Sequence, residues 1–437
     1  MKDDLGLELS GADAGAHDHY RVALRGLQTF TGDPLAALER AIAARPDFTM
    51  AHVLKGWLHA LSTEAAAMQV ARGAHEAALA LPMTDREAAH VAALGALAGG
   101  GWAKASRILE VLAKDEPRDA LALQIGHQID FFTGNAPMLR DRIARALLAW
   151  DDTMPGYHAM LAAHAFGLEE CGEYSRAEAE GRKAARLEPL DGWAQHAVAH
   201  VLEMQSRQRE GILWMRSNEA NWAGDSFLKV HNWWHLALYH YELGDHDAVL
   251  SLYDEHVFGE AAGVVLNLVD ASALLWRLHL AGVDCGDRWE VLAERWAPHA
   301  GAANHAFNDA HAMMAFAAAG RADLMAELED AQARAAAGAG DNAAFTRDVG
   351  QPVAQAVKTF AQGHPADAVR LLLPVRDIAH RFGGSHAQRD FLDLTLIEAV
   401  IRTGEATLAR SLSAKRHEAR PTSPLSELFR KRAADIG

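Results

Sequence analysis

Two pairs of histidines, each pair four residues apart, are the feature of this sequence that most directly suggests chemistry. His196 and His200 stand in WAQHAVAHVLEM, and His231 and His235 follow in VHNWWHLALYHYE. On an α-helix, residues four apart lie one above the other on the same face. Each pair therefore presents two imidazoles to one side of a helix, where they could bind a metal ion or a polar ligand.

A carboxylate accompanies the first pair, because Glu203 lies one helical turn beyond His200. Zinc and iron sites need three or more nitrogen or oxygen ligands from a protein, and four imidazoles could supply them. Residue 197 is alanine, so the His-Glu-x-x-His pattern of many zinc peptidases is absent. The candidate metal ligands are His196, His200, His231 and His235, and the candidate catalytic residues are His200, Glu203 and His235. Whether the histidines hold zinc, hold iron or only fill space in a helical core stays open here.

Two downstream blocks add further candidates. In FNDAH, Asp309 and His311 would point about 200° apart on a helix, so Asp309 is expected to cap or buttress rather than share a small site. In GGSHAQRD, Ser385 is a good helix N-cap, and Arg389 is expected to pair with Asp390 or a loop, or to clamp a carboxylate or phosphate. The candidate ligand-binding residues are His196, His231, Asn232, Trp234, Asp309, His311, Arg389 and Asp390.

A repeat of helical hairpins is expected to position these side chains. The segment from His158 to Leu190 has the turn glycine, small packing residues and terminal proline of a tetratricopeptide unit. The turn position recurs at Gly32, Gly100, Gly134, Gly172, Gly244, Gly282, Gly320, Gly363 and Gly404, and Ser206 occupies the equivalent place. The prediction is an all-α, tetratricopeptide-like α-solenoid of about eleven helical hairpins curled into a superhelix, with the histidine pairs on first helices that line the concave face.

The domain prediction is a single solenoid over residues 1–437, with residues 1–15 and 424–437 frayed or capping. Two stretches rich in glycine and alanine, Val257–Val264 and Ala335–Asn342, are expected to be flexible and are candidate domain boundaries. The tryptophans are expected to pack between repeats or, alternatively, to form the floor of a groove. They are Trp214, Trp222, Trp233 and Trp234.

Composition excludes several classes of partner. The formal net charge is −16, from 42 Lys and Arg against 58 Asp and Glu, and no basic stripe is present. Nucleic acid and anionic membrane surfaces are therefore not expected as partners. No apolar run reaches the length of a membrane span, the first residues lack the pattern of a signal peptide, and Cys171 and Cys285 lie far apart. These features predict a cytoplasmic protein with reduced thiols, and a homo-oligomer is compatible with them.

Five blocks, in order and spacing, carry a resemblance to a known family: AVAHVLEM, VHNWWHLALYHYE, FNDAH, RDVGQP and GGSHAQRD. They resemble the tetratricopeptide repeat protein 38 family over nearly the whole chain. The resemblance implies an all-helical, repeat-built, soluble protein and implies no particular reaction. The groove is expected to hold a small molecule, since its central helices carry His, Trp, Glu and Asn but few cations. A tetratricopeptide scaffold that binds a peptide or protein partner in this groove is the alternative.

Overall fold

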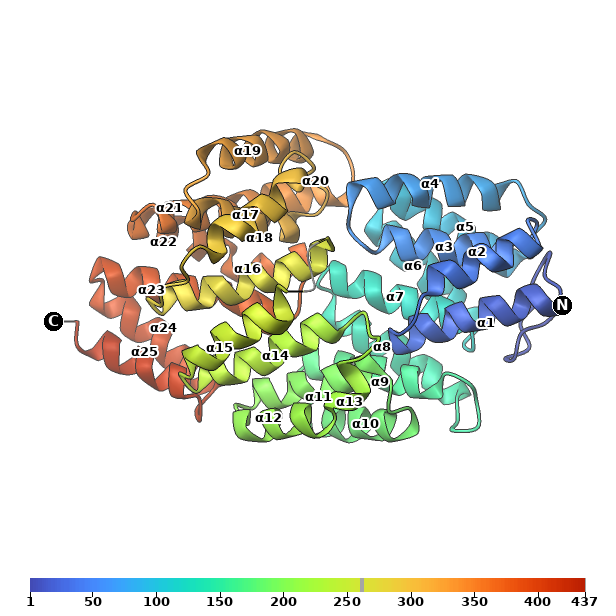
Figure 1. Ribbon diagram of the computed structural model, residues 1–437, viewed down its shortest axis with the longest axis horizontal. Coiled ribbons are helices and arrows are strands. Elements are labelled where there is room, and N and C mark those ends of the chain that lie inside the picture. Colours follow the sequence, from blue (N-terminus) through green and yellow to red (C-terminus); the bar gives the residue numbers. More distant parts are fainter. Residues whose placement is uncertain (260–262, 437) are drawn as a thin grey trace. The chain divides into compact units, whose positions relative to one another are not determined.

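Helices make up most of the structure, which is a computed structural model that describes residues 1–259 and 263–436 (Figure 1). Within those two ranges no strand forms, and the only isolated β-bridges join Lys2 to Glu8 and Thr31 to Ser226. The predicted all-α class is therefore confirmed.

The chain divides into two compact units, Met1–Val198 with Glu219–Lys229 and Ala199–Asn218 with Val230–Gly437, and each is described by itself. The first contains α1 (Ala14–Thr29), α2 (Pro34–Ala44), α3 (Thr49–Ala60), α4 (Ala65–Leu79), α5 (Asp85–Ala98), α6 (Trp102–Asp115), α7 (Ala120–Phe132), α8 (Ala136–Ala146), α9 (Tyr157–Glu170), α10 (Tyr174–Leu187) and α13 (Glu219–Trp222). Helix α11 (Gly192–Met204) begins in the first unit and ends in the second. The second contains α12 (Gln208–Ser217), α14 (Lys229–Glu242), α15 (His246–Leu252), α16 (Val265–Leu280), α17 (Arg288–Trp296), α18 (Ala306–Ala318), α19 (Ala322–Ala337), α20 (Asp341–Phe345), α21 (Gln351–Ala361), α22 (Pro365–Val375), α23 (His386–Thr403), α24 (Ala406–Ala419) and α25 (Pro424–Ala434).

Consecutive helices form hairpins, as the repeat pattern predicts. Across the described residues there are eleven such pairs, α1/α2, α3/α4, α5/α6, α7/α8, α9/α10, α11/α12, α14/α15, α16/α17, α18/α19, α21/α22 and α23/α24. Every predicted turn residue has a positive φ, from 63° at Gly134 to 87° at Gly100, and Ser206 has 55°. A left-handed residue just after a helix ends it and reverses the chain, which is why glycine recurs there. The tetratricopeptide-like repeat fold is confirmed.

The structure agrees only in part with the prediction that two stretches rich in glycine and alanine are flexible. Helix α19 continues through Ala337 and α20 begins at Asp341, so most of the Ala335–Asn342 stretch is helical, because alanine favours helix strongly. Of Val257–Val264, residues 260–262 lie outside the described residues. Both stretches belong to the second unit, and the division between units falls elsewhere. Near the C-terminus, α25 buries Phe429 and Ala433 and packs against α24.

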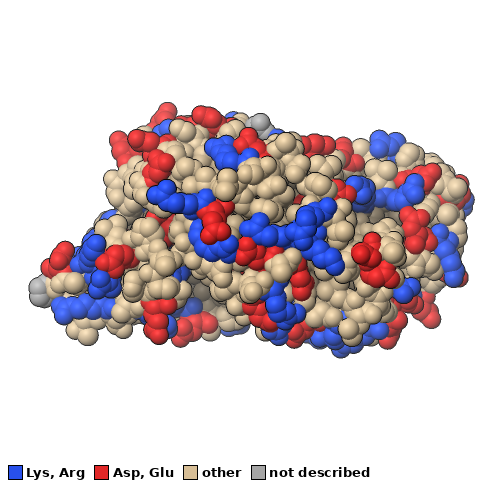
Figure 2. All heavy atoms as spheres, turned by 90° about the horizontal axis from the view of Figure 1, so that it is seen from below, with Lys and Arg blue, Asp and Glu red and all other residues tan. Residues whose placement is uncertain are grey.

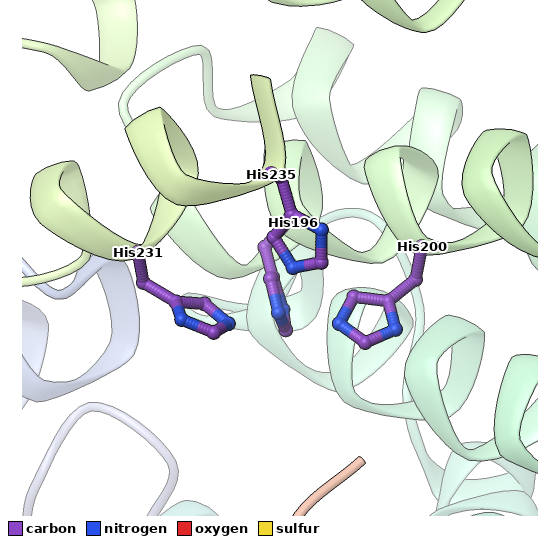
Figure 3. Close-up of side chains that lie close together, drawn as sticks. All are labelled: His196, His200, His231 and His235. Atoms are coloured by element: carbon purple, nitrogen blue, oxygen red, sulfur yellow. The ribbon is translucent and has the colours of Figure 1, made fainter. Parts of the chain in front are cut away.

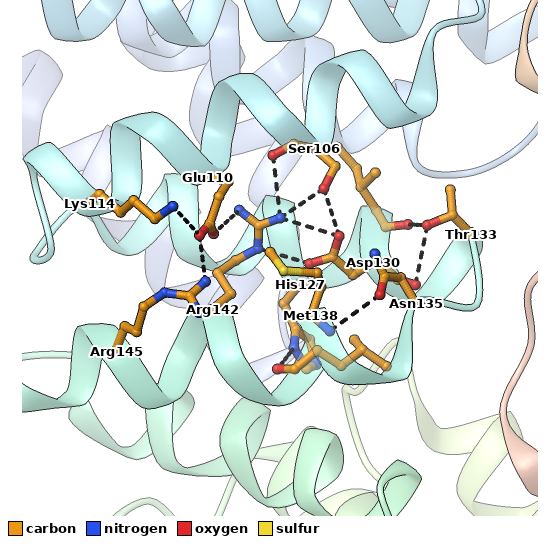
Figure 4. A network of polar contacts seen from close by, with 12 residues as sticks. Ser106, Glu110, Lys114, His127, Asp130, Thr133, Asn135, Met138, Arg142 and Arg145 are labelled. Atoms are coloured by element: carbon orange, nitrogen blue, oxygen red, sulfur yellow. Dashed lines mark hydrogen bonds and ion pairs between the residues drawn. The ribbon is translucent and has the colours of Figure 1, made fainter.

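The first unit holds a buried ion-pair network between α6, α7 and α8 (Figure 4). The guanidinium of Arg142 is fully buried and donates from Nε to Asp130 at 2.9 Å and from Nη2 to the Ser106 hydroxyl at 2.8 Å. Its Nη1 lies 3.3 Å from Glu110. A buried charge is tolerated only when it is paired and hydrogen-bonded, so this network fixes the three helices to one another.

Exposed basic side chains lie among acidic ones, both on the face shown in Figure 2 and in surface ion pairs such as Arg321 with Asp323 at 2.7 Å. With this mixed surface and a net charge of −16, we expect no binding of duplex DNA or RNA at physiological salt, because such binding depends on releasing counterions from phosphates. A gel shift with a random duplex in about 150 mM salt checks this. Retention at micromolar protein would contradict it. Separately, none of the helices within the described residues has the length and apolarity required to span a membrane.

Candidate metal and ligand site

Three imidazoles of the second unit meet where α11 lies beside α14 (Figure 3). The ring of His235 lies 4.4 Å from that of His200 and 4.8 Å from that of His231, measured between centroids. Each ring offers a nitrogen within 4.8 Å of the others. His200 and His235 are fully buried, and the side chain of His231 is 14% exposed. His196 precedes His200 by one turn on the continuous helix α11, and its ring completes the group of four, called here the histidine cluster.

A glycine and a tyrosine hold α14 at the distance this cluster needs. The Tyr239 hydroxyl donates a hydrogen bond of 2.6 Å to the carbonyl of Ala199, which directly precedes His200. A Cβ atom on Gly211 of α12 would lie 2.3 Å from the Tyr239 ring, so only glycine leaves the ring this place. The tyrosine therefore ties α14 to α11 one turn after His235, and this fixes which residues of the two helices face each other.

Two carboxylates orient the imidazoles of α14. The Nδ1 of His235 donates to Glu203 at 3.0 Å, and the Nδ1 of His231 donates to both oxygens of Asp270 on α16 at 2.9 and 3.0 Å. With the proton on Nδ1, the lone pair of each neutral ring lies on Nε2. A carboxylate that accepts from the far nitrogen is the usual partner of a metal-binding histidine. Asp270 was not among the predicted residues. Its only sequence signal is an acidic residue in the apolar run VVLNLVDASALLW.

Burial raises the pKa of Glu203 to about 7, and the nearby charges of Arg420, His200 and Arg277 offset only part of that effect. A carboxyl group with this pKa takes up and releases a proton near neutral pH, as a general acid or base must. Glu203 therefore combines two properties, since it orients His235 and can exchange a proton. Its predicted catalytic role remains a prediction.

Next to Glu203 lies a narrow, charged pocket that has room for about one water molecule. Asp390 lines it and accepts a bidentate pair from Arg416, at 2.6 and 3.0 Å, with Arg420 at 4.0 Å. Arg420 also donates to the Met204 sulfur at 3.2 Å. Asp390 thus pairs with arginines of α24 and of the segment after it, and not with its neighbour Arg389. Neither Arg416 nor Arg420 was predicted, since the sequence gives no sign that they meet Asp390.

Arg277 of α16 closes the other side of this pocket and is almost fully buried. It donates to the backbone carbonyls of Ala273 and Ala387, and its guanidinium lies 5.3 Å from the Trp234 ring centroid. Trp234 is itself fully buried and stacks on His231 at 5.2 Å. The tryptophan therefore has a packing position beside the cluster. Trp233 stacks on His256 at 3.9 Å instead.

The predicted pair on α18 is split between two environments, as the helical angle requires. Asp309 lies within the first turn but is not the cap, because His305 is the N-cap residue and forms no side-chain cap. Burial raises the pKa of Asp309 to about 7, partly offset by Gln332 of α19. His311 donates from Nδ1 to the carbonyl of Phe307 at 2.8 Å, and burial lowers its pKa to about 3, so it stays neutral in a core position.

Two candidate ligand-binding residues remain, Asn232 and Arg389, together with the predicted helix cap at Ser385. Ser385 is the N-cap of α23 and forms a capping box with Gln388, as predicted. Arg389 donates to the carbonyl of Gly384 in its own entry turn. Asn232 is fully buried, and its amide has no hydrogen-bond partner among the residues that the structure describes. These observations do not test ligand binding, so the binding roles of Asn232 and Arg389 remain predictions.

Fold and site together define an all-helical repeat protein with a buried histidine cluster. No model of a protein family matches the chain, and the resemblance to the tetratricopeptide repeat protein 38 family stays a prediction. A solved structure described as "Structure of Naa15/Naa10 bound to HypK-THB" is similar to this chain with a TM-score of 0.27 and 10% identity. The match covers 96% of this chain, which spans 65% of the length of that one. With identity and TM-score this low, the likeness carries no argument about function.

Proposed function

We propose that the protein binds a divalent transition-metal ion at His200, His231 and His235, with His196 as a fourth candidate ligand, and uses it to bind or transform a small polar molecule. The observation that carries this proposal is the pair of carboxylate–imidazole hydrogen bonds, Glu203 to His235 and Asp270 to His231, within a cluster of imidazoles. In this arrangement the carboxylates hold the rings of His231 and His235 so that their Nε2 lone pairs point away from the carboxylates, as in metal-binding histidines. Side chains that only fill space in a core do not need to be oriented in this way.

Ligand type narrows the identity of the ion. The cluster offers imidazole nitrogens and no thiolate, which suits zinc, iron, nickel or copper better than calcium or magnesium. Ligands of tetrahedral zinc, at about 2.1 Å each, stand about 3.4 Å from one another. The nitrogens here lie within 4.8 Å of one another, so the rings need to move by about an ångström to close on an ion. Changes of side-chain rotamer can supply a shift of this size.

Glu203 supplies the chemical part of the proposal. Its carboxyl lies 3.0 Å from His235 and has a pKa of about 7. It can therefore exchange a proton with His235 or with a water molecule in the small pocket beside it. Arg277 and Arg420 line the same pocket, which has room for about one water molecule beside the Glu203 carboxyl.

The test is metal binding by protein purified without a histidine tag. We expect the chelator-treated protein to bind Zn²⁺ or Co²⁺ with a Kd below about 1 µM, or about 8 kcal/mol, and to gain thermal stability on binding. His200→Ala and His235→Ala are expected to abolish this binding, because each removes a ligand. Asp270→Asn is expected to weaken it by roughly 10- to 100-fold, because it removes the orienting partner of a ligand. Titration calorimetry and elemental analysis measure both effects.

His240→Ala is the matched control. His240 also lies on α14 and donates from Nδ1 to a carboxylate, Asp245 at 3.0 Å, but it is not part of the histidine cluster. Metal affinity should be unchanged in this variant. The packing hypothesis has a different outcome, in which wild type binds no transition metal and His200→Ala and His235→Ala only lower the melting temperature.

A tetratricopeptide scaffold that takes a peptide remains the alternative function predicted from the sequence. The two functions differ in a measurable way. Peptide binding in a groove needs no metal, so chelation would leave partner capture intact, whereas the metal proposal requires that chelation removes ligand binding.

A further inference from the structure

We propose that the first unit holds a second, separate ligand site, which binds a small molecule with a cationic amino group and an apolar body. The site is a cavity of about 510 Å³ lined by the N-terminal segment, one face of α1 and the start of α9. This volume lies within the usual range of small-molecule pockets. The cavity shares no residue with the histidine cluster, so the two proposals stand independently.

One polar group in the wall of the cavity is the imidazole of His158, which is held in place by the carboxylate of Asp191. The Nδ1 of His158 donates to Asp191 at 2.7 Å, and Asp191 is completely buried. The other oxygen of Asp191 caps α11 by accepting from the backbone of Ala194 at 2.9 Å, so the carboxylate cannot turn. In the neutral ring, Nε2 is then a hydrogen-bond acceptor. His158 lines the cavity, so this acceptor is open to a donor from a ligand or from water.

Three further polar side chains line the cavity from one face of α1. They are His17, Tyr20 and Gln28, which are 9%, 3% and 7% exposed. Within the described residues, none of the three makes a hydrogen bond through its side chain. Buried polar groups in folded proteins are nearly always hydrogen-bonded. His158 adds a fourth polar side chain, which is already bound to Asp191 through Nδ1. None of the four has a polar atom among the enclosed atoms that lack a partner, so their free polar atoms open to the cavity, where a polar ligand can replace water.

The charges around the cavity favour a cation. Its lining includes the carboxylates Asp3, Asp4 and Asp152 and the guanidiniums Arg21 and Arg25. Both arginines are already paired with carboxylates: Arg21 lies 3.1 Å from Asp18 and 3.9 Å from the lining residue Asp4, and Arg25 lies 2.5 Å from Glu188. With Asp18 and Glu188, five carboxylates surround the two guanidiniums. The acidic groups are thus in excess, and an anion entering the cavity would meet net repulsion. An ammonium group can donate to the Nε2 of His158 and is attracted by the acidic excess.

The walls of the cavity define the rest of the ligand. Leu5, Leu24 and Met154 contribute apolar surface, and the rings of Tyr20 and Tyr157 lie beside them. Tyrosine rings attract cations as well as apolar groups, and the Tyr157 ring already has the ammonium of Lys183 over it, 5.1 Å from its centroid. A short aromatic or aliphatic amine matches this combination, since its body would fill the apolar part while its amino group meets the acceptors.

The experiment compares three probes that share a phenyl body: 2-phenylethylamine, 2-phenylethanol and phenylacetate. Titration calorimetry of the full chain at neutral pH measures their affinities. We expect the amine to bind at least about tenfold more tightly than the alcohol and the acid, with a Kd of about 1 mM or below. Equal binding of the acid, or binding of none of the three, would overturn the proposal.

His158→Asn tests the fixed acceptor, because the Asn amide can still donate to Asp191 while the Nε2 acceptor is lost. Amine affinity should fall at least about tenfold. The matched control is His164→Asn, since His164 is also buried and donates from Nδ1 to a carboxylate, Glu180 at 2.6 Å, but does not line the cavity. If His158→Asn does not fold, as judged by circular dichroism, Gln28→Leu supplies the test. Unchanged amine binding in a folded variant of either kind would refute the site.

Discussion

Replacing Asp309 with Asn is expected to stabilise the protein at pH 8 by on the order of 4 kcal/mol and to have little effect near pH 4. Burial raises the pKa of this carboxyl from 3.8 to about 7. The folded state therefore holds a proton that the unfolded state releases between these two values. Stability contributed by Asp309 is present below pH 3.8 and is lost as the pH rises through 7, at about 1.4 kcal/mol per pH unit. Asn is neutral at every pH and avoids this loss.

Denaturant unfolding at several pH values between 4 and 8 measures the effect. The difference in unfolding free energy between Asp309→Asn and wild type should grow with pH and level off above pH 7. Asp323→Asn is the control, because Asp323 lies on the neighbouring helix α19 but is exposed, and Arg321 lowers its pKa to about 2. An Asp309→Asn variant that is less stable than wild type at pH 8 would show that the charged carboxyl has a partner that stabilises it.

This expected gain has a functional meaning. A buried carboxyl that destabilises the fold at neutral pH is of no benefit to stability, and such groups are concentrated at functional sites. Burial shifts the pKa of Glu203 in the same direction, to about 7. If Asp309→Asn is more stable but impaired in ligand binding, the predicted ligand-binding role of Asp309 gains its first support.

The repeat fold could be read from the sequence because it depends on local signals. Each turn needs a left-handed residue, and the spacing of these residues identifies the helices between them. Ser206 shows how far such reasoning extends, since its place in the repeat predicted a turn that its residue type does not favour, and its φ is 55°. The stretch Ala335–Asn342 was predicted less well, because glycine and alanine favour opposite structures there.

The candidate site could be read from the sequence only where its residues share a helix. His231 and His235 are four residues apart on α14, so their common face follows from helical geometry. Asp270, in contrast, reaches His231 from a different helix 39 residues away. Which helices become neighbours depends on packing between repeats, and no pattern within either helix records it. The same reason explains why pairing with Arg389, one of the alternatives predicted for Asp390, is not found, and why Asp390 pairs with Arg416.

Replacing Arg416 with Met is expected to lower the free energy of unfolding by about 3–5 kcal/mol, because it leaves Asp390 charged, buried and without its bidentate partner. Burial acts to raise the pKa of Asp390, but Arg416 and Arg420 hold it well below the usual value, so the carboxylate is charged at every pH where the protein is normally studied. The side chains of Arg416 and Asp390 are only 5% and 13% exposed. Denaturant unfolding of the variant measures the loss.

Arg376→Met is the matched control for this effect. Arg376 pairs at 2.6 Å with Asp393, which lies three residues after Asp390 on α23, but the two side chains are 22% and 38% exposed. Solvent screens such a pair, so the variant should lose at most about 1 kcal/mol. Asp390→Asn combined with Arg416→Met should recover most of the stability, because the double variant no longer has an unpaired buried carboxylate at position 390.

The same variants decide whether Asp390 binds a ligand. Arg416 occupies both oxygens of Asp390, so a ligand that used this carboxylate would have to displace the arginine. A purely structural pair predicts that folded Arg416→Met protein keeps its affinity for Zn²⁺ and that only its stability changes. If Arg416→Met instead folds with the stability of wild type and loses affinity for metal, the pair belongs to the site, and the predicted ligand-binding role of Asp390 is the better account.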